Sequence, residues 1–202
     1  MKKKTIMERV SINRSITRIS HEIIENLNEN HESVLIGIHN RGVPLAKRIK
    51  SEIFKISGIQ TKLGSLDISF HRDDYRERLI MPEVRGSDIH FSLDNKEVFL
   101  IDDVLFTGRT IRAALDELNS FGRASKVKLA VLIDRGHREL PIKADFTGKN
   151  IPTHEGEHVE VNFLEIDGKD SVILTSCEGW SFGTKTFTFF KKLSKKRYRD
   201  YS

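Results

Sequence analysis

The sequence is poor in the features that mark secreted, membrane-spanning and disulfide-stabilised proteins. Its 202 residues include one cysteine, Cys177, which excludes an intrachain disulfide and a cysteine-rich metal site. No apolar run is long enough to cross a bilayer, and the basic start MKKKTIMERV lacks the apolar stretch of a signal peptide. We therefore expect a cytoplasmic protein with no membrane association.

Most of the chain also lacks an excess of charge. The formal net charge is +5, but residues 176–202 hold seven Lys or Arg against two acidic residues, so residues 1–175 are neutral overall. The same segment holds seven of the 16 aromatic residues. We interpret residues 1–175 as one globular domain and residues 176–202 as a basic, aromatic extension. Such interleaving suits single-stranded RNA, and an extension without a role is the open alternative.

Strand and helix patterns alternate along the domain. Apolar residues at helical spacing predict a helix over residues 13–29, and the helix that follows carries Pro44 near its start and stops at Gly58. Buried or short strands are predicted over residues 33–38, 61–70, 98–101, 126–133, 159–163 and 172–174, with a helix over 110–121. This order predicts an α/β fold with a mainly parallel sheet flanked by helices.

Two segments break the alternation. Residues 71–95 are charged and lack a sustained period, and so long a connection in a compact domain is typical of a functional loop or lid. Residues 134–153 are rich in charge and turn residues and are interpreted as an irregular excursion.

The most informative segment is VFLIDDVLFTGRT at residues 98–110. An apolar strand leads to Asp102 and Asp103, and a turn from Thr107 to Thr110 opens a helix. The amide groups at a helix start favour a phosphate, while carboxylates accept hydrogen bonds from sugar hydroxyls. Two adjacent acids alone also fit a metal site or a solvated strand end, but the turn favours a ribose phosphate.

A second turn, Asn40-Arg41-Gly42, follows the first predicted strand. Gly42 permits a tight turn, and Arg41 offers a bidentate guanidinium to phosphate oxygens. Parallel strands bring their carboxyl ends to one edge, where ligands bind, so both turns are expected there.

Residues 98–110 resemble the phosphoribosyl-pyrophosphate (PRPP) motif of type I phosphoribosyltransferases. The resemblance implies that fold, with a flexible loop at about 71–95 and a hood over the base at about 134–153, and a non-proline cis peptide bond near Asn40-Arg41. It assigns catalysis to Asp102, Asp103, Arg41 and Arg72. It assigns PRPP binding to Asn40, Arg41, Gly42, Asp102, Asp103, Val104, Leu105, Phe106, Thr107, Gly108, Arg109 and Thr110.

Several longer segments of the sequence resemble one particular family among these enzymes. DDVLFTGRT, LAVLIDRGHRELPIKAD, GKNIPT and TRISHEII resemble the PyrR family of bifunctional pyrimidine operon attenuators and uracil phosphoribosyltransferases, over about residues 8–175. The resemblance implies conversion of uracil and PRPP to UMP and diphosphate, with Mg²⁺ held mainly through PRPP and no metal site from the protein alone. It also implies a homodimer or higher oligomer.

The same resemblance implies regulation of transcription. Members bind the leader mRNA of pyrimidine operons under the control of UMP or UTP. The residues that it nominates for RNA are Thr17, Arg18, His21, His137, Arg138, Lys143 and Lys149. Two departures are Phe106, where tyrosine is common, and His154, where serine is usual. An RNA-binding regulator with a vestigial nucleotide-sensing site, or a phosphoribosyltransferase for another base, remain alternatives.

Overall fold

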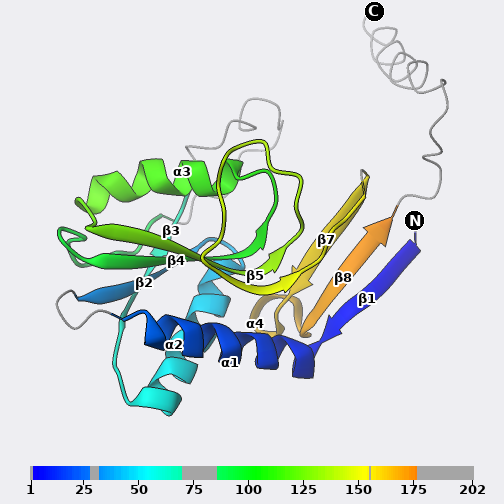
Figure 1. Ribbon diagram of the computed structural model, residues 1–202, viewed down its shortest axis with the longest axis horizontal. Helices are drawn as coiled ribbons and strands as arrows, with labels where there is room; N and C mark the ends of the chain where they lie inside the picture. The colour runs from blue at the N-terminus through cyan, green and yellow to red at the C-terminus, as the bar shows by residue number, and fades with distance from the viewer. Residues whose placement is uncertain (1, 28–31, 70–85, 155, 177–202) are drawn as a thin grey trace, which may run out of the picture.

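A five-stranded parallel sheet forms the centre of the computed structural model, which describes residues 2–27, 32–69, 86–154 and 156–176 (Figure 1). Its strand order is β3-β2-β4-β5-β6, and every neighbouring pair is parallel. The strands are β2 (Ser33–Ile38), β3 (Lys62–Leu66), β4 (Glu97–Leu105), β5 (Lys126–Asp134) and β6 (Phe146–Asn150). The predicted α/β class with a parallel sheet is confirmed.

Helices cover both faces of this sheet. α1 (Arg9–Glu25) and α2 (Gly42–Ser57) pack on one face, and α3 (Arg109–Leu118) lies on the other (Figure 1). Phe99 and Ile101 of β4 join the core on the side of α1 and α2, whereas Val98 and Leu100 join the core on the side of α3. A strand buried on both faces has no polar alternation, which explains the continuous apolar run in the sequence.

A smaller antiparallel sheet lies beside the first. Its order is β1-β8-β7, from β1 (Lys2–Glu8), β8 (Ser171–Ser176) and β7 (Glu157–Asn162), and α4 (Leu164–Asp167) joins β7 to β8. Figure 1 shows it at the end of α1 where that helix begins. The sequence pattern predicts β7 and β8 but not β1. The KKKTIME segment is mostly exposed, and its pairing with a strand near the other end of the domain decides its conformation.

Several predicted boundaries are wrong. The first helix begins at Arg9 rather than residue 13 and ends at Glu25 rather than residue 29. The last predicted turn of the third helix is a separate 3₁₀ helix, Asn119–Phe121. Residues 134–153 are not irregular throughout, because Phe146–Asn150 forms β6 at the edge of the central sheet. We therefore use the term hood segment for residues 135–145 alone.

The predicted loop 71–95 is packed where it is described. Ile89 and Leu93 are buried in the core on the side of α3. Ser65 and Asp88 exchange main-chain hydrogen bonds of 3.0 and 2.8 Å, which ties this segment to β3. The polar composition of the loop hid these two anchors. None of the described helices is long and apolar enough to cross a membrane.

Candidate active site

Two loops meet at the carboxyl edge of the central sheet. The first, residues 39–41, joins β2 to α2, and the second, residues 106–108, joins β4 to α3. β2 and β4 are hydrogen-bonded neighbours, so the loops are adjacent. The peptide bond between His39 and Asn40 is cis, next to the expected position. A Cβ atom on Gly42 would lie 2.5 Å from the main-chain oxygen of Ile101 and 3.3 Å from Cα of Asp102, so the contact requires glycine.

The two candidate catalytic carboxylates lie within β4, not after it as predicted. β4 pairs with β5 at Asp102 and again at Val104, so the sheet fixes the main chain of Asp102 and of Asp103 between them. Asp102 is buried, and its Oδ1 accepts a hydrogen bond of 2.9 Å from the amide of Asp103. Burial raises the pKa of Asp103, although the hydrogen bond with Asp102 and the charge of Arg41 act in the opposite direction. Arg41 and Asp103 are thus close enough for their charges to interact.

The PRPP-motif loop, residues 106–110, leads into α3. Gly108 adopts a left-handed conformation with φ of 94°, and the amide of Arg109 donates to Oγ1 of Thr107 at 3.3 Å. Gly108 precedes α3 and has no side chain to cap the helix, so the amide groups of the first turn beyond Arg109 can meet an anion. Leu105 is buried in the core, so only its main chain faces the loop. A helix start of this kind can bind a phosphate.

Arg41 has an ion-pair partner that the sequence does not predict. Its Nη2 lies 2.9 Å from Oδ1 of Asp167, and its Nε donates to Oδ2 at 3.4 Å. Asp167 is the last residue of α4, far along the chain from Arg41. The local sequence LEIDGKD contains three acids and gives no sign of which one meets an arginine.

The hood segment is attached to the PRPP-motif loop. The amides of Glu139 and Leu140 donate to the main-chain oxygen of Thr107 at 3.0 and 3.1 Å. Arg138 donates from Nη1 to the oxygen of Phe106 at 2.7 Å and from Nε to the oxygen of Ile142 at 2.9 Å. Arg138, nominated above for RNA, therefore also joins the hood segment to the loop.

Phe106 packs against a buried arginine. The guanidinium carbon of Arg135 lies 3.9 Å from the centroid of the Phe106 ring, a cation–π contact. Arg135 is 6% exposed and donates to Oγ1 of Thr153 at 3.2 Å and to the oxygen of Glu157 at 2.7 Å. Burial lowers the pKa of Arg135. The absence of a tyrosine hydroxyl at Phe106 thus leaves the ring packing intact.

The residues nominated for RNA divide into two groups. On α1, Arg18 donates to the main-chain oxygens of Thr147, at 3.1 Å, and Gly148, which places it beside exposed Lys149. His21 is exposed on the same helix, but Thr17 is half-buried and donates to Oε1 of Glu52 at 2.8 Å.

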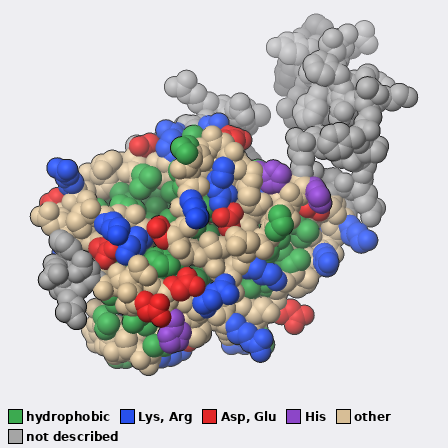
Figure 2. Space-filling view, viewed as in Figure 1, with side chains coloured by type: hydrophobic (Ala, Val, Ile, Leu, Met, Phe, Trp, Pro, Cys, Tyr) green, Lys and Arg blue, Asp and Glu red, His purple; other side chains and the backbone are tan. Residues whose placement is uncertain are grey.

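The second group lies in the hood segment. His137 and Lys143 are exposed, and Nε2 of His137 lies 2.6 Å from the main-chain oxygen of Thr153. Figure 2 shows basic and acidic side chains interspersed on the face drawn, which agrees with the neutral charge of residues 1–175. Arg72 and the extension from Cys177 onward lie outside the described residues.

Metal-binding residues do not cluster in the described part of the chain. There, no group of three or more His, Cys, Asp or Glu side chains is arranged to hold a metal ion. Asp102 and Asp103 of β4 bring two carboxylates to the carboxyl half of the central sheet.

Known proteins share this fold and sequence. The phosphoribosyl transferase domain family matches residues 5–166. The hypoxanthine phosphoribosyltransferase of Staphylococcus aureus superposes with a TM-score of 0.64 at 18% identity, covering 87% of this chain and 93% of that one. The enzyme of Trypanosoma cruzi gives 0.65 at 15% identity, covering 87% and 97%. The fold is that of the type I phosphoribosyltransferases, and the chain belongs to the phosphoribosyl transferase domain family.

Relatives of about 50% sequence identity identify the family more narrowly within the phosphoribosyltransferases. Bifunctional protein PyrR of Clostridioides difficile is 49% identical over 174 residues, which cover 86% of this chain and 98% of the relative. Bifunctional protein PyrR of Alkaliphilus metalliredigens is 52% identical over 169 residues, which cover 84% and 93%. The chain belongs to the PyrR family, and the resemblance seen in the sequence is confirmed.

Proposed function

We propose that this chain transfers the phosphoribosyl group of PRPP to uracil, giving UMP and diphosphate, and that it regulates pyrimidine operons by binding their leader mRNA. The observation that carries the enzymatic half is the contact of Gly42 with Ile101 and Asp102. This contact places the loop that carries Arg41, which suits a diphosphate, next to Asp102 and Asp103, which suit the hydroxyls of a ribose. Membership of the PyrR family supports both halves.

The chemistry follows from this arrangement. N1 of uracil forms a bond to C1′ of PRPP while the bond from C1′ to the diphosphate oxygen breaks. The diphosphate leaves with the electron pair, and the N1 proton passes to water or to the diphosphate. Asp102 and Asp103, in ionised form, stabilise the positive charge that develops on the ribose. Arg41 binds the diphosphate, and the amides at the start of α3 bind the 5′-phosphate.

Magnesium fits this site as a partner of the substrate. Mg²⁺ typically uses one or two carboxylates together with substrate phosphates, and Asp102 with Asp103 provides such oxygens. When bound, the ion neutralises charge on the leaving diphosphate. PRPP, uracil, UMP or UTP and the leader mRNA are thus the proposed partners of a homodimeric or larger cytoplasmic protein.

The RNA role is supported by the juxtaposition of Arg18 and Lys149. Helix α1 and β6 lie side by side, so basic residues from distant parts of the sequence share one surface. Exposed His21 extends that surface along α1. Lysine and arginine neutralise RNA phosphates, and a second copy of the chain would double the basic area.

Pyrophosphate release tests the enzymatic half. With uracil, PRPP and Mg²⁺ present, purified protein should release diphosphate and form UMP, whereas hypoxanthine and guanine should give no product. Folded protein that releases none with uracil would refute the enzyme and favour the vestigial-sensor alternative. Turnover with a purine would favour the other alternative, a phosphoribosyltransferase that acts on another base.

A pair of arginine variants tests the RNA half. Arg18→Ala should weaken binding to a pyrimidine-operon leader, with and without UMP, because Arg18 adjoins Lys149. Arg14→Ala is the matched control, since Arg14 is an exposed arginine one turn away on α1. Both variants should retain UMP synthesis. Equal losses of RNA binding, or a parallel loss of synthesis in Arg18→Ala, would refute the proposed surface.

A further inference from the structure

The guanidinium of Arg41 is held from one side. Asp167 contacts Nη2 at 2.9 Å and Nε at 3.4 Å, so the carboxylate takes up one edge of the guanidinium plane. Burial opposes charge on Arg41, but the contact with Asp167 outweighs it and raises the pKa of Arg41. A bidentate contact of this kind fixes the plane of an arginine as well as its position. The Nη1 group of Arg41, on the other edge, can then meet a phosphate.

Asp167 is itself fixed by the main chain of α4. Its Oδ2 accepts a hydrogen bond of 3.0 Å from the amide of Phe163, and its own amide donates to the oxygen of Phe163 at 2.7 Å. Phe163 is fully buried in the core. The carboxylate that orients Arg41 therefore has little freedom to move.

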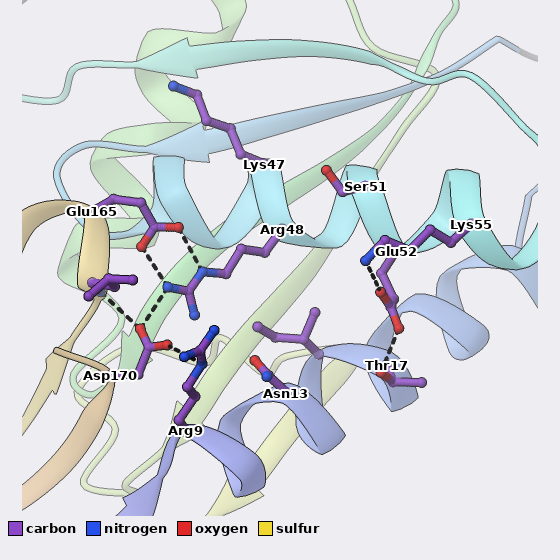
Figure 3. A pocket seen from close by; sticks show the side chains of 12 residues that line it. Arg9, Asn13, Thr17, Lys47, Arg48, Ser51, Glu52, Lys55, Glu165 and Asp170 are labelled. Carbon is purple, nitrogen blue, oxygen red and sulfur yellow. Dashed lines mark hydrogen bonds and ion pairs between the residues drawn. The ribbon is translucent and has the colours of Figure 1, made fainter.

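A second arginine braces α4 against α2. Arg48 lies about two turns after Arg41 and binds both Glu165, at 2.6 and 2.8 Å, and Asp170, at 2.6 Å (Figure 3). Its guanidinium also lies 4.9 Å from the centroid of the Phe163 ring. Arg48, Glu165 and Asp170 are among the residues that line a cavity of about 490 Å³ between α1, α2 and α4. The brace holds the turn that carries Asp167 independently of Arg41.

From this arrangement we propose that Asp167 is a positioning residue that holds Arg41 in the orientation needed to bind the diphosphate group of PRPP. The inference rests on the proposed function, because it assumes that Arg41 binds diphosphate. Asp167 acts through Arg41 and does not contact the substrate. A rigid arginine binds an anion without first losing rotamer freedom, which is the benefit of preorganisation.

The sign of the effect separates positioning from simple electrostatics. Asp167 is an anion close to a site for anions. Removing its charge without any positioning role would strengthen diphosphate binding, because a repulsive charge is lost. Loss of positioning would weaken binding instead. Asp167→Asn therefore has opposite expected outcomes under the two explanations.

The test is calorimetric titration of the full-length protein with PRPP, diphosphate and UMP in the presence of Mg²⁺. Asp167→Asn should raise the Kd of PRPP and of diphosphate about tenfold, the scale of one charge-assisted hydrogen bond. The Kd of UMP, which has no diphosphate group, should stay unchanged. The matched control is Glu160→Gln, which removes an exposed negative charge of β7 that acts on Arg41 through charge alone, whereas Asp167 also accepts hydrogen bonds from Arg41.

Four results would overturn the inference. The first is an unchanged or lower Kd of diphosphate in Asp167→Asn, and the second is an equal change in the Kd of UMP. The third is an equal change in Glu160→Gln, and the fourth is a difference from wild type that disappears as the Mg²⁺ concentration is raised. The last would mean that Asp167 acts on the metal ion. Wild-type protein that binds neither PRPP nor diphosphate would overturn the proposed function as well, whereas normal wild-type binding confines a failure to Asp167.

Discussion

Arg138 donates a hydrogen bond of 2.7 Å from Nη1 to the main-chain oxygen of Phe106, joining the hood segment to the PRPP-motif loop. Its Nη2 binds Asp134 at the end of β5, so one side chain connects the sheet, the hood segment and the loop. RNA that binds the hood segment would act on a structure already attached to the nucleotide site. This offers a physical path between the two proposed activities.

Arg138→Ala should therefore impair both activities. We expect kcat/KM for PRPP to fall about tenfold or more, because the loop loses several charge-assisted hydrogen bonds. Binding to the leader mRNA should weaken in the same variant. Arg123→Ala, an exposed arginine between α3 and β5 at the opposite edge of the sheet, serves as control. Normal synthesis of UMP by Arg138→Ala would show that the loop does not depend on this contact.

Gly42→Ala should abolish UMP synthesis by separating the two loops. The added Cβ would lie 2.5 Å from the oxygen of Ile101, and its nearest neighbours are main-chain atoms of Ile101 and Asp102 rather than the end of a flexible side chain. Steady-state kinetics and PRPP titration should both show the loss. Gly58→Ala is the control, because Gly58 has a positive φ but nothing within 4 Å of its Cβ position. That variant should lose about 1 kcal/mol of stability and keep its activity.

Asp102→Asn combined with Asp103→Asn should lower turnover by about 10³-fold or more, since both charges that stabilise the ribose cation are lost. Asparagine keeps an oxygen that can accept the hydrogen bond now made between Oδ1 of Asp102 and the amide of Asp103. The circular dichroism spectrum should accordingly match that of wild type. Substantial turnover in the double variant would refute the assignment of these carboxylates.

The brace formed by Arg48 should make stability depend on pH. Burial opposes ionisation of Asp170, but hydrogen bonds from Arg48 and the amide of Leu164 outweigh it and hold the pKa of Asp170 below its ordinary value of 3.8. A lowered pKa stabilises the fold at pH values above 3.8, and this stabilisation is lost as pH falls through the lowered value. Urea unfolding at a series of pH values measures this change in the free energy of unfolding.

Asp170→Asn should lower the free energy of unfolding by about 2 kcal/mol at pH 7 and by less at pH 3. The stabilities of wild type and of the variant should therefore converge in acid. The control is Asp116→Asn, whose exposed partner is Arg112, and it should cost about 0.5 kcal/mol or less. A constant difference between wild type and Asp170→Asn across this pH range would contradict the assignment.

Local patterns in the sequence were sufficient for the three inner strands of the central sheet and for the PRPP motif. β2, β4 and β5 are apolar because both of their faces are covered, so composition alone marks them. The motif is contiguous, since strand, acids, turn and helix follow one another along the chain. Composition also located the whole charge excess in residues 176–202.

The tertiary structure decided what depends on distant partners. β1 is a strand because it pairs with β8, and β6 is a strand because it completes the central sheet beside β5. Asp167 meets Arg41 only when α4 folds against α2, and no local pattern distinguishes it from Glu165 or Asp170. Hydrophobic periodicity reports on burial near each residue, whereas ion pairs between remote segments leave no periodic trace.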